Sequence, residues 1–223
     1  IGGRPAATPA TSLPVSGSRL VADVGEQSWV SRGAHKLIGA LDAFGLAVDD
    51  RRCLDAGAST GGFTEVLLDR GAREVVAVDV GYGQLAWPLR THPGVTVMER
   101  TNVRDLTAEA IGGPVDLVVA DLSFISLATV LPALTACASR SADIVPMVKP
   151  QFEVGKERVG AGGVVSDPAL RADAVLSVAR RAAALDWHTV GVVASPLPGP
   201  AGNVEYFVHL RADTDRALAG DAL

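Results

Sequence analysis

The sequence contains few of the residues that build disulfide frameworks or metal centres. Its 223 residues include two cysteines, Cys53 and Cys137, and both lie in apolar surroundings. Two cysteines are too few for a disulfide scaffold, and we expect both thiols to be buried. The four histidines are far apart in the chain and no Cys-x-x-Cys is present, so we predict no metal site.

Long apolar runs and an excess of basic residues are also missing. No stretch of about 18 uninterrupted apolar residues occurs, so we predict no membrane span and no membrane partner. Lys and Arg number 20 against 25 Asp and Glu, a formal net charge of −5, which argues against nucleic-acid binding by bulk positive charge. No signal peptide is visible, and we expect a cytoplasmic protein.

The first 27 residues differ from the rest of the chain. They are rich in Gly, Pro, Ala, Ser and Thr, and two short apolar runs at 13–15 and 20–24 could form one or two short strands. Such a segment cannot bury a core alone. The sequence opens at Ile1 without an initiator Met, and we interpret it as a fragment. We expect residues 28–30 to be a linker and residues 31–223 to form one domain.

From Ser31 onward, predicted strands alternate with predicted helices. Ser31 is a candidate helix N-cap, Leu37, Leu41 and Phe44 recur at helical spacing, and Gly45 ends this helix. Further helices are expected at 63–69, 126–138 and 167–185, and strands at 52–55, 74–79, 95–98, 115–120, 144–148, 189–194 and 204–210. This order predicts an α/β fold with a mostly parallel, seven-stranded sheet covered by helices on both faces.

A glycine-rich turn, Leu-Asp-Ala-Gly-Ala-Ser-Thr-Gly-Gly-Phe at 54–63, lies between a predicted strand and helix. Open α/β sheets bind their cofactors at this place. Ser59 stands where a dinucleotide fingerprint needs its second glycine, and a Cβ there obstructs a pyrophosphate. Asp79, at the end of the next strand, can accept hydrogen bonds from ribose hydroxyls. A nucleoside without a diphosphate points to S-adenosylmethionine, and a turn without any ligand is the alternative.

The segment Asn102-Val103-Arg104-Asp105 follows the third predicted strand. In such a sheet this loop lies beside the adenine, whose edge Asn102 or Asp105 could bond. A plain loop with an Asx turn is an equally good interpretation.

Four ionisable residues stand where apolar or loop residues are expected. Lys36 lies in the first helix, Asp121 and Lys149 end two apolar strands, and Glu205 adjoins a third apolar run. The carboxyl ends of parallel strands meet at one edge, so Asp121 and Lys149 should lie close together. Each residue alone could form a structural salt bridge. Two lysines and two carboxylates in one cleft are a better catalytic candidate than any single member.

This residue set suits methyl transfer to an oxygen. A ribose 2′-hydroxyl is hardly ionised near neutral pH, and a lysine can take its proton where partial burial and a second ammonium group favour the neutral amine. Many amino-methylating enzymes carry a Pro-Pro motif after the fourth strand. The segment 121–124 reads Asp-Leu-Ser-Phe instead, which favours oxygen over nitrogen as the acceptor.

Five motifs in order resemble the TlyA family of ribosomal RNA 2′-O-methyltransferases, which are also called hemolysins and are built on an FtsJ/RrmJ-like domain. They are SRGAHKL at 31–37, the glycine turn, ADLSF at 120–124, VKPQF at 148–152 and GNVEYF at 202–207. The resemblance covers about residues 31–211. It implies a Rossmann-like class I methyltransferase with a catalytic tetrad of Lys36, Asp121, Lys149 and Glu205.

The resemblance also implies a cofactor, a substrate and a domain order. S-adenosylmethionine would contact Asp55, Gly57, Ser59, Gly61, Gly62, Phe63, Asp79, Val80, Asn102, Val103 and Asp121. The substrate would be cytidine 2′-hydroxyls of small- and large-subunit ribosomal RNA. Family members carry an N-terminal alpha-L-type RNA-binding domain, and residues 1–27 are similar to its last third.

Candidate RNA contacts, which should surround the mouth of the cleft, are Arg32, His35, Lys156, Arg158 and Arg171. The polar, glycine-rich segment 151–167 follows Lys149, and we predict a mobile flap that orders on RNA. The segment 195–203 carries three prolines and should be stiffer, positioning Glu205.

Membrane lysis and a non-catalytic cofactor- or ribosome-binding module are the alternative functions. The first needs a span or a cationic amphipathic face that the sequence lacks, and the intact tetrad argues against the second. The sequence leaves the oligomeric state and the target nucleotide open.

Overall fold

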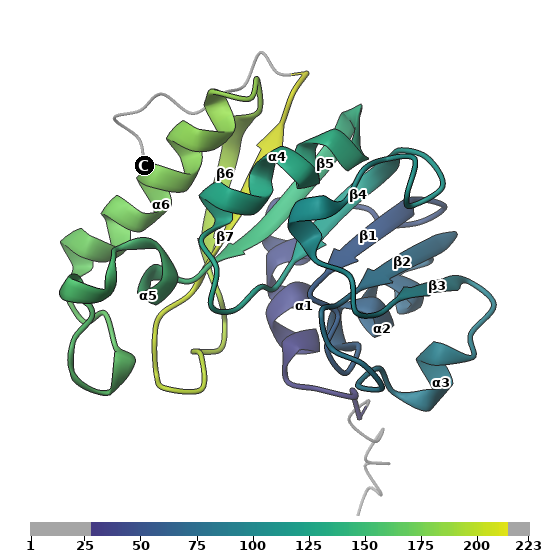
Figure 1. Ribbon diagram of the computed structural model, residues 1–223, viewed down its shortest axis with the longest axis horizontal. Coiled ribbons are helices and arrows are strands. Elements are labelled where there is room, and N and C mark those ends of the chain that lie inside the picture. Colours follow the sequence, from purple (N-terminus) through teal and green to yellow (C-terminus); the bar gives the residue numbers. More distant parts are fainter. Residues whose placement is uncertain (1–27, 214–223) are drawn as a thin grey trace, which may run out of the picture.

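The computed structural model describes residues 28–213 (Figure 1). A seven-stranded sheet in the order β3-β2-β1-β4-β5-β7-β6 forms the centre of the molecule. The short strands and the RNA-binding remnant predicted within residues 1–27 lie outside the described residues.

The strands confirm the predicted mostly parallel sheet. Strands β1 to β5 pair in parallel, whereas β7 runs antiparallel to both β5 and β6. Their bounds are β1 Arg52–Ala56, β2 Glu74–Val78, β3 Val95–Met98, β4 Val115–Ala120, β5 Ala138–Val148, β6 His188–Ala194 and β7 Tyr206–Arg211.

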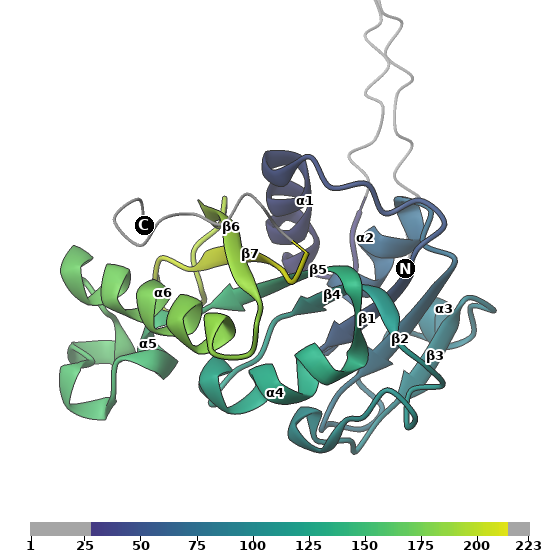
Figure 2. The same cartoon turned by 90° about the horizontal axis from the view of Figure 1, so that it is seen from above.

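Helices cover both faces of the sheet, as predicted. Figure 2 shows α1 and α2 on one face and α4, α5 and α6 on the other. The helices are α1 Gly33–Phe44, α2 Gly62–Asp69, α3 Trp87–Arg90, α4 Leu127–Cys137, α5 Pro150–Glu153 and α6 Pro168–Ala183. Three short 3₁₀ turns, η1 Val103–Asp105, η2 Lys156–Arg158 and η3 Ala161–Gly163, lie in the connections.

Each face of the sheet has its own hydrophobic core, which explains the unbroken apolar run of β4. Val118 and Ala120 belong to the core under α4 and α6, whereas Leu117 and Val119 belong to the core under α1 and α2. A strand buried on both faces needs apolar residues at every position rather than at alternate ones.

Several element boundaries differ from the predictions. Helix α1 has Arg32 rather than Ser31 in its N-cap position, although Ser31 Oγ accepts a hydrogen bond from the Gly33 amide at 3.2 Å. Strand β5 begins at Ala138, directly after α4, because Ala138 pairs with Val115 of β4; an irregularity then separates this pair from the next one, Leu117 with Asp143. Gly45 ends α1 with a φ of 63°, as expected of a helix-terminating glycine.

A buried ion cluster ties β5 and β7 to the segment before β1. Asp143, 1% exposed, accepts a hydrogen bond from Arg51 at 2.6 Å and lies 2.7 Å from His209 Nε2. Burial of Asp143 opposes its ionisation, but the bonds from His209 and Arg51 outweigh this and hold the carboxyl pKa below its usual range.

Asp143→Ala should lower the free energy of unfolding by about 1–3 kcal/mol at pH 7, because it leaves the partly exposed Arg51 and the buried His209 without their shared hydrogen-bond partner. The folded-state pKa of Asp143 is lowered, so its stabilisation exists above the unfolded pKa and is lost as pH falls through the folded pKa. The deficit of the variant should therefore shrink below about pH 4. Urea unfolding at pH 7 and pH 3 measures this. Asp213→Ala, which removes an exposed partner of Arg211, is the control, and an equal loss in both variants would contradict the prediction.

Candidate active site

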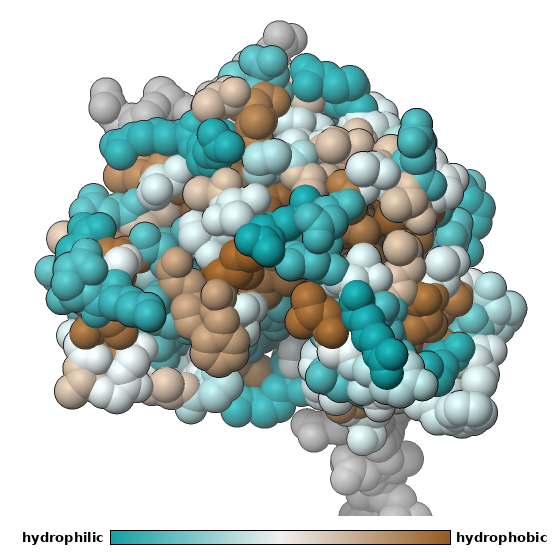
Figure 3. Space-filling model, viewed as in Figure 1, coloured by the Kyte–Doolittle hydropathy of each residue, from teal (hydrophilic) through white to brown (hydrophobic). Residues whose placement is uncertain are grey.

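Three adjoining cavities lie beside the carboxyl ends of β1, β2, β4 and β5. The small cavity, about 320 Å³, is bounded by the start of α1, the glycine turn and Asp121. The middle cavity, about 540 Å³, extends from that turn past Asp79 to Asn102 and Phe124. The large cavity, about 870 Å³, lies between Phe124, Lys149 and the segment 155–163. Figure 3 shows the surface hollowed at the lower edge of this view, with apolar side chains nearby.

The glycine turn leaves no room for side chains at its critical positions. Gly57 has a φ of 88°, and a Cβ there would lie 2.5 Å from the carbonyl oxygen of Asp121. The amides of Gly57 and Ala58 both donate to the Val78 carbonyl, at 2.8 and 3.1 Å. Gly61, with a φ of 103°, occupies the N-cap position of α2. Glycine is required here by both the left-handed backbone and the close approach of the β4 end.

Asp79 is held rigidly at the edge of the middle cavity. Its two carboxylate oxygens accept hydrogen bonds from the amides of Ser59, at 2.8 Å, and Gly81, at 2.7 Å. Asn102 lines the same cavity while its side chain caps η1 by accepting from the Arg104 amide at 3.1 Å. Asn102 therefore both forms an Asx-type turn and faces the cavity, whereas Asp105 lines none of the three cavities.

Asp55 lies beneath the turn and lines none of these cavities. It is fully buried, and one carboxylate oxygen accepts a hydrogen bond from the Thr64 hydroxyl at 2.7 Å. The other oxygen has no hydrogen-bond partner among the described residues. Burial raises the pKa of Asp55 to about 7, partly opposed by the Thr64 bond. A buried carboxyl with an unused oxygen is an unsatisfied acceptor beside the predicted cofactor site.

The four predicted catalytic residues form two ion pairs. Lys36 Nζ lies 2.5 Å from Glu205 Oε2, and Lys149 Nζ lies 2.6 Å from Asp121 Oδ1. Lys149 also donates a hydrogen bond to Ser123 Oγ at 2.9 Å. The predicted proximity of Asp121 and Lys149 is thus observed, and among the described residues no ion pair joins Asp121 to Lys36.

The surrounding loops hold these pairs in place. Glu205 precedes β7, and Gly199 packs so closely against it that a Cβ there would lie 2.5 Å from Glu205 Oε1. This is the contact expected of the stiff 195–203 segment. Glu153, whose pKa is raised by burial, accepts hydrogen bonds from the Ser126 hydroxyl at 2.6 Å and the Leu127 amide at 2.8 Å. It thereby caps α4 from the segment after Lys149. Sequence reasoning missed this role, since the Ser126 N-cap alone does not reveal a second acceptor.

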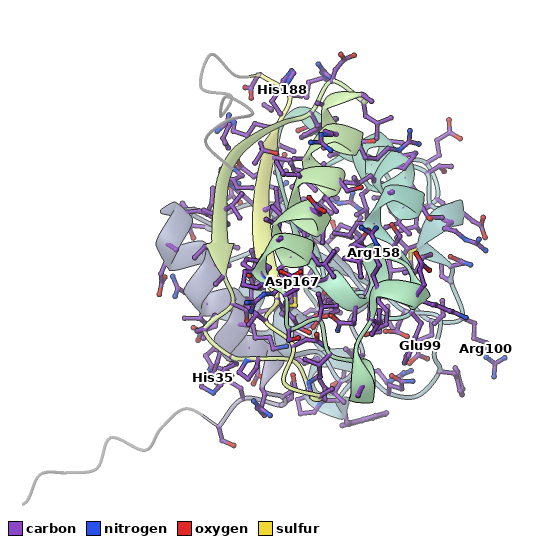
Figure 4. The ribbon with its side chains drawn as sticks, turned by 90° about the vertical axis from the view of Figure 1, so that its left-hand side faces the viewer. His35, Glu99, Arg100, Arg158, Asp167 and His188 are labelled. Atoms are coloured by element: carbon purple, nitrogen blue, oxygen red, sulfur yellow. The ribbon has the colours of Figure 1, made fainter. Side chains whose placement is uncertain are left out.

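The predicted RNA contacts are not all at the cavities. Arg32 lines the small cavity and Lys156 the large one, and both are exposed. His35 is exposed on α1 (Figure 4) but lines no cavity. Arg158 donates to the Val154 carbonyl at 2.6 Å, and neither it nor Arg171 lines a cavity.

One residue at the cavities was missed as a site candidate. Phe124, at 92% exposure and a φ of 64°, lies between the middle and large cavities. Its ring centroid is 5.2 Å from that of Phe152. An exposed Phe in a left-handed conformation is unusual, and such strain gathers at functional sites. Its place in the ADLSF motif is the only signal that the sequence carries.

Residues 28–213 contain no group of His, Cys, Asp and Glu side chains that could hold a metal ion. No helix in that part of the chain is long and apolar enough to cross a membrane.

The sheet order, the glycine turn after β1 and the acid after β2 define a methyltransferase of the Rossmann-like class. The model of the FtsJ-like methyltransferase family matches residues 29–212. The chain belongs to this family.

Comparisons with individual proteins show which members of the family the chain resembles. The chain is 71% identical over all its 223 residues, and 83% of the relative's length, to the 16S/23S rRNA (cytidine-2′-O)-methyltransferase TlyA of Mycobacterium tuberculosis. It is 36% identical over 182 residues to Hemolysin A of Brachyspira hyodysenteriae, covering 81% of this chain and 76% of the relative. A solved structure of a hemolysin-named protein from Streptococcus thermophilus superposes with a TM-score of 0.82 and 39% identity, over 87% of this chain and 70% of that one.

Asp55→Asn should stabilise the ligand-free protein at pH 8 and do so much less at pH 4. The raised pKa means that the carboxyl stabilises the fold only below its unfolded value, and this contribution is lost as pH rises through about 7. Asn keeps an acceptor for the Thr64 hydroxyl but never ionises. Thermal unfolding at both pH values measures the effect. A pH-independent difference from the unsubstituted protein would contradict burial of the charge as its cause.

Proposed function

We propose that this protein transfers a methyl group from S-adenosylmethionine to the 2′-hydroxyl of cytidines in small- and large-subunit ribosomal RNA. The observation that carries the proposal is the pair of buried lysine–carboxylate contacts between the glycine-turn cavities and the large cavity. The name of the TlyA relative supports both the oxygen acceptor and the RNA substrate. Ribosomal RNA as substrate also implies a cytoplasmic site of action.

The residues beside the glycine turn fit S-adenosylmethionine, which supplies an electrophilic methyl group on a sulfonium. Asp79 holds a fixed carboxylate where ribose hydroxyls would bond, and Gly57 keeps the backbone open beside Asp121. The middle cavity is lined by seven of the predicted cofactor residues, namely Gly57, Ser59, Asp79, Val80, Asn102, Val103 and Asp121. Gly62 and Phe63 line the small cavity. Gly61 is the N-cap residue of α2 at the end of the turn, and Asp55 is buried at the beginning of the turn.

In this proposal Lys149 removes the proton of the 2′-hydroxyl. Its amine reaches the boundary between the cavities, where Asp121 and Ser123 fix its position. Glu205 holds the Lys36 ammonium, whose positive charge would favour a developing alkoxide. Lys36 as the base is the alternative assignment, and variants of the two lysines distinguish them.

The large cavity has the composition needed to receive a nucleotide. Exposed Phe124 offers a ring face, Lys156 a cation, and the glycines of 155–163 an open backbone. An RNA base can be reached in this way only when it is unstacked. Arg32, His35, Arg158 and Arg171 would contact more distant phosphates. We further propose that residues 1–27 belong to an RNA-binding domain preceding the methyltransferase domain.

Lys149→Ala should lower kcat by about 10²–10⁴-fold, the range typical of a lost general base. Lys36→Ala should lower kcat less if Lys36 acts only through its charge. Transfer of labelled methyl from S-adenosylmethionine to ribosomal subunits, with the label mapped to a ribose, measures this. Lys156→Ala is the matched control, since an exposed phosphate contact should raise KM for RNA at nearly constant kcat. Label on a base, or undiminished transfer by both folded lysine variants, would refute the proposal.

Phe124→Ala should raise KM for RNA with KM for S-adenosylmethionine nearly unchanged. Stacking of a base on an aromatic ring contributes about 1–3 kcal/mol, which predicts a rise of roughly 5- to 150-fold. Phe124→Leu keeps the apolar surface without the ring and serves as the control. If the Leu variant matches the unsubstituted protein, Phe124 acts by burial rather than by stacking.

A further inference from the structure

The side chain of Asn203 links two loops that border the large cavity. It is 2% exposed, and its Oδ1 accepts a hydrogen bond from the Val165 amide at 2.9 Å. Its Nδ2 donates to the Gly163 carbonyl at 2.8 Å. One amide group thus pairs with both a backbone donor and a backbone acceptor of the same segment, which neither a carboxylate nor an apolar side chain can do.

These two bonds are the main polar attachment of the segment 155–165. Its other hydrogen bonds within the described part of the chain stay inside 154–164, as between the Gly160 amide and the Val164 carbonyl at 3.0 Å. Val154 and Val165 are buried in the core, at 1% and 2% exposure, while most residues between them are exposed. The segment is therefore anchored at both ends, and Asn203 supplies the polar anchor of the second.

Asn203 also lies next to the catalytic machinery. Its carbonyl accepts a hydrogen bond from the Gly199 amide at 2.9 Å, and Gly199 packs against the carboxylate of Glu205. Glu205, two residues further on, holds Lys36. Displacement of 155–165 thus acts on the same short turn that delivers Glu205.

In place of the mobile flap that the sequence predicts at 151–167, we propose that Asn203 is a positioning residue that holds segment 155–165 as a preformed wall of the large cavity before RNA binds. This proposal rests on the proposed function for its substrate, and it assigns Asn203 to RNA capture. The small and middle cavities contain no residue of 155–165, so the segment itself borders neither cavity of the predicted cofactor site. In this proposal segment 155–165 has the same position in the free protein as in the RNA complex, so RNA binding does not have to order it.

Limited trypsin digestion of the ligand-free 223-residue chain tests the attachment directly. Lys156 and Arg158 place two cleavage sites in the segment. Asn203→Ala should raise cleavage there about 30-fold, because two hydrogen bonds of about 1 kcal/mol each are lost. Asn203→Asp keeps the acceptor for Val165 and should give a smaller rise. Val178→Ala, a fully buried core position in α6, controls for general loss of stability and should leave this cleavage unchanged.

Steady-state kinetics test whether this attachment contributes to RNA binding. Asn203→Ala should raise KM for RNA by up to about 30-fold, which corresponds to the same loss of about 2 kcal/mol, with KM for S-adenosylmethionine unchanged. Unaltered cleavage at Lys156 and Arg158, or a parallel rise in both KM values, would overturn the proposal. If the unsubstituted protein methylates no ribose, the proposed function fails, whereas the digestion result still decides whether Asn203 holds the wall.

Discussion

Two buried lysine side chains at the carboxyl edge of the sheet are the constraint on which the arrangement of the site depends. Lys36 and Lys149 are each 8% exposed, and a buried charge without a partner is strongly destabilising. Their carboxylates come from other elements: Asp121 from the end of β4, and Glu205 from the turn before β7. The second pair joins the first helix of the domain to its last strand. The antiparallel β7 brings Glu205 to the edge where the parallel strands end.

The parts of the site that follow strand ends could be predicted from the sequence. Asp121, Lys149 and Asp79 each follow an apolar run, and a parallel sheet brings such positions to one edge. The glycine turn could be predicted because backbone conformation selects glycine there. Parts that depend on tertiary contacts could not be predicted. Asn203 and Glu153 are common loop and helix residues whose partners lie 38 and 26 residues away, and no local pattern encodes these bonds.

The predicted and observed boundaries of β5 differ for the same reason, a contact with another element. The first half of β5 carries Ser and Arg, a composition typical of a loop, yet Ala138 and Asp143 at its two ends pair with β4, and Asp143 is buried in an ion cluster. The helix start at Arg32 has no polar side-chain cap, because Ser31 bonds Gly33 from one position earlier. In the strand a contact from another element replaces the local signal on which sequence patterns depend, whereas at the helix start the local cap is displaced by one residue.

The acidic excess of the chain is compatible with an RNA substrate because a formal count ignores where charges lie. Asp143 and Glu205 are buried and paired with cations, and Asp55, with a pKa of about 7, is only partly ionised at neutral pH. None of these projects a full negative charge toward an approaching RNA. Exposed Arg32 and Lys156 lie instead on the cavity walls. The field that RNA meets is set by such exposed charges within about one Debye length, roughly 8 Å at physiological salt, and not by the net charge of −5.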